Sequence, residues 1–240
     1  MKTRELLLAT LEKVARELGP DCAGVVFVGG TVAALYEDAT LDVRPTDDVD
    51  VVTAVALPQY YALLERLKAK GFGPCLDEDA PVCRLVTSSG LKVDVMPVDP
   101  AVLGFSNRWY PEAFARAGAY RLPGGTQVKA ITPPYFLATK LEAFRGRGNG
   151  DFRSSHDLED LVSLLGRMPQ LLEELRSSGE PVAEWLVAEL RALAGKRAFL
   201  EAVEGCFPGD AASQQVAAAL LESLEALRTS ATGRRARRRR

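Results

Sequence analysis

The chain has 240 residues, of which 47% are hydrophobic and 26% are charged, and its formal net charge at pH 7 is −2. This composition is typical of a globular protein, and it excludes wholesale disorder and fibrous repeats. The longest apolar runs are far shorter than a membrane span, and the charged N-terminus does not match an export signal. We therefore expect a cytoplasmic protein with no membrane association, large enough for one large domain or two modest ones.

Side chains that bind soft metals are scarce in this sequence. It has four cysteines, with no C-x-x-C pair among them, and a single histidine, His156. These counts exclude a disulfide framework, a zinc ribbon and any site built from several histidines. Carboxylates would have to hold any metal that the protein uses, which favours Mg²⁺ or Mn²⁺.

The first part of the chain mixes helical and strand patterns. Leucines at helical spacing predict a first helix, and a β-branched run predicts a short buried strand that ends at Gly29-Gly30. A second helix is expected to open at Thr31, which is a suitable N-cap residue. The first helix is expected over 3–18 and the first strand over 25–28. The remaining expected elements are a helix over 59–70 and strands over 49–55, 82–86 and 91–98.

Strand patterns stop after residue 98, and from Pro133 to about Arg228 the pattern is helical throughout. We therefore predict an α+β protein in which a mixed β-sheet with flanking helices is followed by an all-α helical C-terminal domain. The expected domains are residues 1–130, 131–230, and a disordered basic tail over 231–240. Six arginines lie in the last seven residues. That tail is either a phosphate-binding arm for nucleic acid or a solvated terminus without a function.

Two aspartates lie close together on the predicted strand that follows Arg44. Side chains alternate along a strand, so Asp48 and Asp50 share one face while Val49 and Val51 point into the core. At that spacing both carboxylates can reach a pair of cations. Their mutual repulsion has to be relieved by a cation or by raised pKa values. The alternative is a solvent-exposed acidic strand start, which is common.

A third aspartate, Asp94, lies between Val93 and Val95 in an otherwise apolar strand. A charged side chain in such a place has to be paired, bound to a metal, or at the exposed edge of the strand. Placed beside the strand of the first two aspartates, it completes a three-carboxylate cluster suited to hard divalent metals. The nearby Asp99 precedes Pro100 and fits a turn better than this cluster.

Gly29, Gly30 and Thr31 come directly after the first strand. Glycines let the backbone approach a phosphate, and the start of a helix offers free N–H groups. The sequence has neither the Rossmann glycine pattern nor the Walker lysine, so these two kinds of nucleotide site are excluded. The alternative is an ordinary turn between a strand and a helix.

Taken together, the Gly29–Thr31 turn, Asp48 and Asp50 on one strand, and Asp94 on a later strand resemble the DNA polymerase β-like nucleotidyltransferase superfamily. Its signature is an hG[G/S] turn followed by DhDh and a third carboxylate. The long gap before Asp48, with Arg44 and Thr46 inside it, is similar to the AbiEii-type group of type IV toxin–antitoxin systems.

The helical half is similar to the same group, in which a K-x-x-A helix precedes a D-x-x-D-L helix. Lys140 lies on an apolar helical stripe, where a lysine either extends to solvent or meets an anion. Asp157 and Asp160 are three residues apart and share one helix face. An arginine usually stands where this chain has His156, which we expect to be a helix-start residue. Ser155, His156 and Asp157 are helix neighbours, so they cannot form a hydrolase triad.

The resemblance implies a nucleotidyltransferase fold and transfer of an NMP from an NTP to an acceptor hydroxyl, with Mg²⁺ or Mn²⁺ as cofactor. It implies that Asp48 and Asp50 hold two metal ions and that Asp94 completes the site and orients or deprotonates the acceptor. The glycine turn would hold the phosphates, and Lys140 would neutralise the leaving pyrophosphate. The implied nucleotide-binding residues also include Arg44, Asp157 and Asp160; Arg44 would pair either with a phosphate or with the acidic cluster.

The acceptor stays open at this point. AbiEii-type proteins imply the 3′ end of tRNA as acceptor and an antitoxin protein as partner. A small-molecule acceptor, as in aminoglycoside nucleotidyltransferases, is an alternative within the same class. Two alternatives from other classes are a catalytically silent module that binds nucleotide or RNA, and a purely structural protein.

Overall fold

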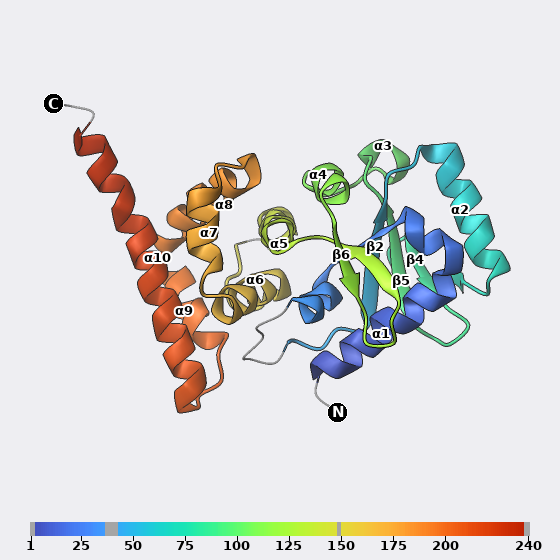
Figure 1. Cartoon of the computed structure of the whole chain (residues 1–240), viewed down its shortest axis with the longest axis horizontal. Helices are drawn as coiled ribbons and strands as arrows, with labels where there is room; N and C mark the ends of the chain where they lie inside the picture. Colours follow the sequence, from blue (N-terminus) through green and yellow to red (C-terminus); the bar gives the residue numbers. More distant parts are fainter. Residues whose placement is uncertain (1–2, 37–42, 148–149, 238–240) are drawn as a thin grey trace. The chain divides into compact units, whose positions relative to one another are not determined.

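The computed structural model describes residues 3–36, 43–147 and 150–237 (Figure 1). The described residues up to Thr139 form one compact unit, and those from Lys140 onward form a second. The change from strands to helices comes after Ala130, where the last strand ends. The boundary between the compact units lies further along, within α5 (Pro133–Arg147).

A seven-stranded sheet forms the centre of the first unit, in the order β3-β4-β5-β2-β1-β7-β6. The two pairs β2–β5 and β1–β7 are parallel, and the other neighbouring pairs are antiparallel, so the sheet is mixed as predicted. The bounds are β1 (Val26–Val28), β2 (Asp48–Thr53), β3 (Gly73–Pro74), β4 (Arg84–Val86), β5 (Lys92–Pro97), β6 (Gly118–Arg121) and β7 (Gln127–Ala130).

The expectation that strands end after residue 98 is wrong. Strands β6 and β7 form a hairpin, and β7 joins the sheet beside β1 through the pairing of Ala130 with Phe27. Each of the two strands has four residues, and β6 alternates intermediate and exposed positions without a buried side chain. Such short segments carry too little periodicity to be recognised, and the pairing with β1 stabilises them instead.

Helices surround this sheet (Figure 1). On α1, Leu11, Val14 and Leu18 are fully buried, as the leucine spacing predicted, whereas Leu6, which was expected on the same stripe, is exposed. The segment expected to open a helix at Thr31 is a short 3-10 helix that begins at Gly30. The other helical segments of this unit, besides the start of α5, are α1 (Thr3–Leu18), η1 (Gly19–Gly24), η2 (Gly30–Leu35), α2 (Leu57–Ala69), α3 (Pro100–Leu103) and α4 (Tyr110–Ala115).

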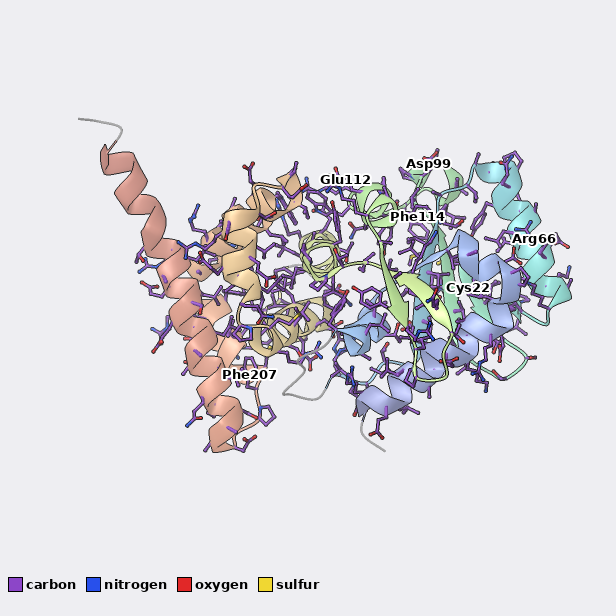
Figure 2. All side chains as sticks on the ribbon, viewed as in Figure 1. Cys22, Arg66, Asp99, Glu112, Phe114 and Phe207 are labelled. Carbon is purple, nitrogen blue, oxygen red and sulfur yellow. The ribbon has the colours of Figure 1, made fainter. Side chains whose placement is uncertain are left out.

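The second unit is helical in all its described elements. Its helices, after the end of α5, are α6 (His156–Arg167), α7 (Leu171–Ser178), α8 (Pro181–Ala194), α9 (Arg197–Gly205) and α10 (Ala211–Arg237). Close packing inside this unit depends on Gly166 of α6, where a Cβ would lie 2.7 Å from Cζ of Phe207. Phe207, labelled in Figure 2, follows α9 directly.

Helix α10 continues to Arg237, into the stretch that the sequence analysis expected to be an irregular tail. Alanine and arginine both favour a helix, which accounts for the continuation past Gly233. Residues 238–240 of the expected tail lie outside the described residues. Among the residues that the structure describes, no helix combines the length and the apolar character that a membrane crossing requires.

Candidate active site

The three aspartates singled out in the sequence lie on two adjacent strands of the first unit. Strands β2 and β5 run parallel, and their register places Asp50 directly beside Asp94. Aligned residues of neighbouring strands are about 4.8 Å apart and face the same side of the sheet. Asp48 lies two residues earlier on β2, on the same face, while the intervening Val49 is fully buried. The structure therefore brings all three carboxylates to one patch of the sheet.

Gly29 lies against this patch. It follows β1, whose last residue Val28 is the antiparallel partner of Asp50. Its φ of 73° is in the region that favours glycine. A Cβ at Gly29 would lie 1.8 Å from Oδ2 of Asp50, so the carboxylate occupies the space that any other side chain would need.

Arg84 is a site residue that the sequence analysis missed. Its Nε donates to Oδ1 of Asp94 at 2.7 Å, and its Nη2 donates to Oδ2 of Asp94 at 2.8 Å. The same Nη2 lies 2.6 Å from Oδ2 of Asp48. The hydrogen bonds to Asp94, together with the charges of the three aspartates, raise the pKa of Arg84. Its guanidinium thus bridges two carboxylates of the cluster.

The sequence did contain a signal for Arg84. The segment Ser88-Ser-Gly90 predicted a hairpin between the two strands now seen as β4 and β5. In that hairpin Val86 pairs with Lys92, and two residues outward on each strand Arg84 pairs with Asp94. Counting the cross-strand pairs from the turn would have placed the guanidinium opposite the carboxylate.

Neighbouring residues hold the cluster and its glycine turn in place. Thr46 donates from Oγ1 to Oδ1 of Asp48 at 2.9 Å. Thr31 is fully buried, and its Oγ1 has no hydrogen-bond partner among the described residues. Arg44 donates to the carbonyl of Pro45 at 3.1 Å, among other contacts. The Thr31 hydroxyl is therefore a buried polar group without a hydrogen-bond partner among the described residues.

Lys140 forms a separate buried ion cluster in the second unit. Its Nζ lies 2.6 Å from Oδ2 of Asp160 and 3.3 Å from Oδ1 of Asp157, and all three side chains are at most 12% exposed. Of the two expected alternatives, Lys140 therefore meets an anion rather than solvent, and the anions are two carboxylates of α6. Asp157 and Asp160 share a helix face as predicted.

His156 is the first residue of α6, in agreement with its expected place at a helix start. Ser155 is the N-cap, and its hydroxyl accepts from the backbone N–H of Leu158 at 3.3 Å. The imidazole is 75% exposed and lies 3.3 Å from Glu159. Asp99 likewise caps α3 by accepting from the N–H of Ala101, which fits the turn that was expected there.

The donor chemistry of the first cluster fits a hard divalent cation, because Asp48, Asp50 and Asp94 supply only oxygen ligands. Within the described ranges, however, no three or more His, Cys, Asp or Glu side chains are grouped as a metal site. Arg84 lies between Asp48 and Asp94 and supplies the positive charge that the cluster needs. A metal ion that joined Asp48 to Asp94 through the oxygens that Arg84 contacts would have to displace this guanidinium.

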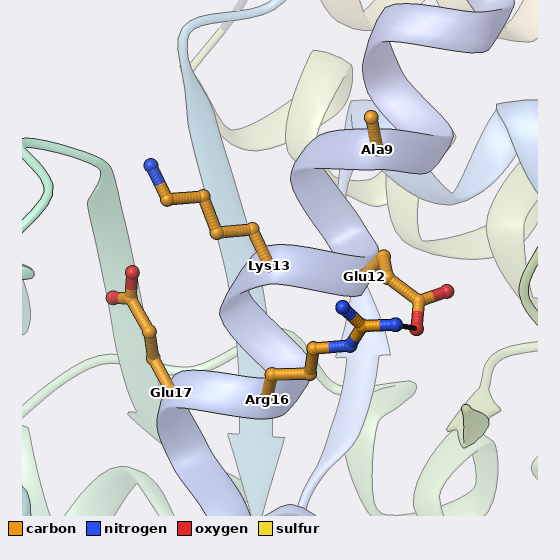
Figure 3. A pocket seen from close by; sticks show the side chains of 5 residues that line it. All are labelled: Ala9, Glu12, Lys13, Arg16 and Glu17. Carbon is orange, nitrogen blue, oxygen red and sulfur yellow. Dashed lines mark ion pairs between the residues drawn. The ribbon is translucent and has the colours of Figure 1, made fainter. Parts of the chain in front are cut away.

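A shallow hollow of about 490 Å³ lies along α1 and is lined by Ala9, Glu12, Lys13, Arg16 and Glu17 (Figure 3). The Glu12 carboxylate pairs with Arg16 at 2.9 Å and accepts from the N–H of Gly124 at 3.0 Å. None of the residues expected to bind nucleotide or metal lines this hollow.

Among solved structures, the chain is similar to an antigenic nucleotidyltransferase-like protein from Paracoccidioides brasiliensis. The two chains are 16% identical, and the match covers 87% of this chain and 96% of that one, with a TM-score of 0.47. No protein-family model matches the sequence, and no curated protein matches it.

Proposed function

We propose that this protein is a nucleotidyltransferase that moves an NMP from an NTP to an acceptor hydroxyl. The observation that carries the proposal is the register of β2 and β5, which places Asp50 beside Asp94 and Asp48 on the same face. Three carboxylates on one face of the sheet, one of them against a glycine turn, resemble the constellation that phosphoryl transfer from a nucleotide uses.

Each residue of the site has a proposed task. Asp48, Asp50 and Asp94 would hold Mg²⁺ or Mn²⁺, which would polarise the phosphate and the attacking oxygen. Asp94 would orient or deprotonate the acceptor hydroxyl. The turn at Gly29 and Gly30 lets the backbone approach the triphosphate, and the buried Thr31 hydroxyl would donate to a phosphate oxygen.

The helical unit has a proposed part in the same reaction. Lys140 would stabilise the leaving pyrophosphate, with Asp157 and Asp160 near the nucleotide, and Arg44 would pair with a phosphate. Because Lys140 is paired with both aspartates, a phosphate would have to compete with these carboxylates for its ammonium.

For the acceptor we propose the 3′ end of tRNA, with an antitoxin protein as partner. The sequence resemblance to AbiEii-type proteins supports both, and six arginines in the last seven residues supply charge for an RNA backbone. A small-molecule hydroxyl is the alternative acceptor within the same class.

One observation favours a second candidate function, a silent module that binds nucleotide or RNA without turnover. Arg84 already pairs with Asp48 and Asp94 and offsets part of their negative charge, so these two carboxylates have a counter-ion without a metal. Such a module would bind NTP and release it unchanged.

Incubation with each α-labelled NTP, Mg²⁺ and total bacterial RNA tests both candidates, with an Asp48→Ala/Asp50→Ala double variant as control. Label in tRNA-sized bands with the wild type alone would support the RNA transferase. Metal-dependent NTP binding without labelled RNA would favour a small-molecule acceptor or the silent module, and a screen of aminoglycosides would separate these. The absence of NTP binding would contradict the proposed function.

A further inference from the structure

Arg84 lies at the point between two carboxylates that a bridging cation would take. Its Nη2 is 2.6 Å from Oδ2 of Asp48 and 2.8 Å from Oδ2 of Asp94. A divalent ion that joined the same two side chains would use these same oxygens, at about 2.1 Å for Mg²⁺. The guanidinium and the ion cannot bind these oxygens together.

The contact is built into the sheet. The β4–β5 register places Arg84 directly opposite Asp94, and the planar guanidinium binds both oxygens of that carboxylate. The side chains of Arg84 and Asp94 are only 19% and 8% exposed. A pair that is both bidentate and shielded from water is stronger than an exposed ion pair.

We propose that Arg84 is a positioning residue that holds the carboxylates in the metal-free protein and leaves them when metal arrives together with a triphosphate. The part that concerns the triphosphate rests on the proposed function. Phosphate oxygens offer the guanidinium a bidentate partner equivalent to the carboxylate that it gives up. Metal alone offers no such partner, so it has to displace Arg84 without compensation.

A thermodynamic coupling between the two ligands follows. Metal alone binds weakly, metal with triphosphate binds tightly, and each ligand raises the affinity of the other by the same factor. The site therefore binds a metal–nucleotide complex in preference to free metal. The pairing of Arg84 with Asp48 and Asp94 would also keep these carboxylates aligned between turnovers, because the guanidinium reduces their mutual repulsion.

Mn²⁺ binding to the full chain without nucleotide, followed by electron paramagnetic resonance, tests the competition directly. Arg84→Gln should raise the Mn²⁺ affinity about tenfold or more, since the metal no longer displaces a charge-assisted pair. Arg84→Lys keeps the charge but loses the bidentate geometry, so it should give an intermediate affinity. Unchanged or weaker binding in both variants would overturn the proposal.

Lys92→Gln is the matched control. Lys92 is on β5 two residues before Asp94, and it forms an ion pair with Asp77 at 2.7 Å. The substitution removes one positive charge from the same edge of the sheet without touching an Arg84 contact. If it raised the Mn²⁺ affinity as much as Arg84→Gln does, a general charge effect would replace the competition.

Stability gives a second measurement in case Arg84→Gln folds poorly. Removal of the guanidinium leaves the buried Asp94 without its partner, and bound metal should replace it. Mn²⁺ should therefore raise the Tm of Arg84→Gln more than that of the wild type. An equal or smaller rise would contradict the proposal.

The coupling is measured by repeating the Mn²⁺ titration with a non-hydrolysable α,β-methylene triphosphate. The analogue should raise the Mn²⁺ affinity of the wild type by a large factor. This factor should be smaller in Arg84→Gln, where only the direct coordination of the metal by the triphosphate still couples the two ligands. If the analogue does not bind the wild type, the proposed function fails, while the nucleotide-free titration still decides whether Arg84 competes with metal. Binding with equal factors in both proteins would overturn the coupling alone.

Discussion

Gly29 and Asp50 are in such close contact that neither can change independently. A Cβ on Gly29 would lie 1.8 Å from Oδ2 and 2.6 Å from Cγ of Asp50. The contact arises because β1 ends at Val28, the cross-strand partner of Asp50, and the chain then turns with a positive φ at Gly29. The glycine turn and the carboxylate cluster are therefore one structural unit.

Gly29→Ala should lower both stability and ligand binding. The new methyl group must displace the Asp50 carboxylate, and the backbone must hold an alanine at a φ that it disfavours. We expect the free energy of unfolding to fall by about 1–3 kcal/mol, and metal–nucleotide binding to be lost. Chemical denaturation and Mn²⁺ titration with a triphosphate measure the two effects.

Gly24→Ala is the control for this substitution. Nothing lies within 4 Å of a Cβ at Gly24, so stability should change by less than about 0.5 kcal/mol. Equal effects at the two glycines would contradict the assigned contact.

Asp48→Ala should abolish nucleotidyl transfer while the protein stays folded. Arg84 keeps both of its hydrogen bonds to Asp94 when Asp48 is removed, so no buried charge is left without a partner. From the sequence alone, the removal of Asp48 would be expected to relieve repulsion among the aspartates and so to stabilise the protein. Because Arg84 already offsets this repulsion, we expect no such gain in stability. A labelled-NTP assay and a thermal melt measure both quantities. Normal turnover would falsify the assignment of Asp48 as a metal ligand.

The parts of this molecule that the sequence predicted are those that local patterns determine. The alternation of Val49 and Val51 with the aspartates fixed which face of β2 carries the charges, and α1 followed its leucine stripe. The hairpin strand β7 has only four residues and depends on its pairing with β1, so no local pattern identified it. The bond from Arg84 to Asp48 also depends on tertiary structure, since it joins strands that β5 separates.

In the helical unit, the contacts of Lys140 likewise depend on tertiary structure and could not be predicted from local sequence patterns. The apolar stripe of α5 was predicted, but the stripe alone does not show that Asp157 and Asp160 of α6 face the lysine. Their spacing of three residues indicated a shared face, without indicating which element that face meets.

Lys140→Met should therefore destabilise the protein. The substitution leaves two carboxylates in a shielded site without their common cation, and we expect a loss of about 2–3 kcal/mol. The double variant Lys140→Met/Asp160→Asn should recover part of this loss because one of the two charges is also removed. Denaturant unfolding of the single and double variants measures the coupling.

Arg145→Met is the matched control on the same helix. Arg145 pairs with Glu189 at 2.7 Å, but its side chain is 50% exposed, so its loss should cost less than about 1 kcal/mol. If Lys140→Met and Arg145→Met lower the free energy of unfolding by the same amount, the buried cluster contributes no more to stability than a surface ion pair.

Asp21 should give the stability a dependence on acid pH. Burial opposes ionisation of this carboxylate, but hydrogen bonds from Lys70 at 2.7 Å and Arg66 at 2.9 Å outweigh burial and lower its pKa. Arg66 is labelled on α2 in Figure 2. A carboxyl group with a lower pKa in the folded state stabilises that state above its unfolded pKa, which is about 3.9. The stabilisation is lost as the pH falls through the folded value.

Asp21→Asn should accordingly cost about 1 kcal/mol at pH 7, and its difference from the wild type should shrink as the pH falls below about 4. Urea unfolding at a series of pH values measures this difference. Asp79→Asn, at an exposed loop position between β3 and β4, is the control for the loss of one carboxylate, and at pH 7 it should change the stability by less than about 0.5 kcal/mol. A constant difference between Asp21→Asn and the wild type across the series would show that Asp21 contributes through packing, because a contribution from its charge has to vanish once the carboxyl group is protonated in both states.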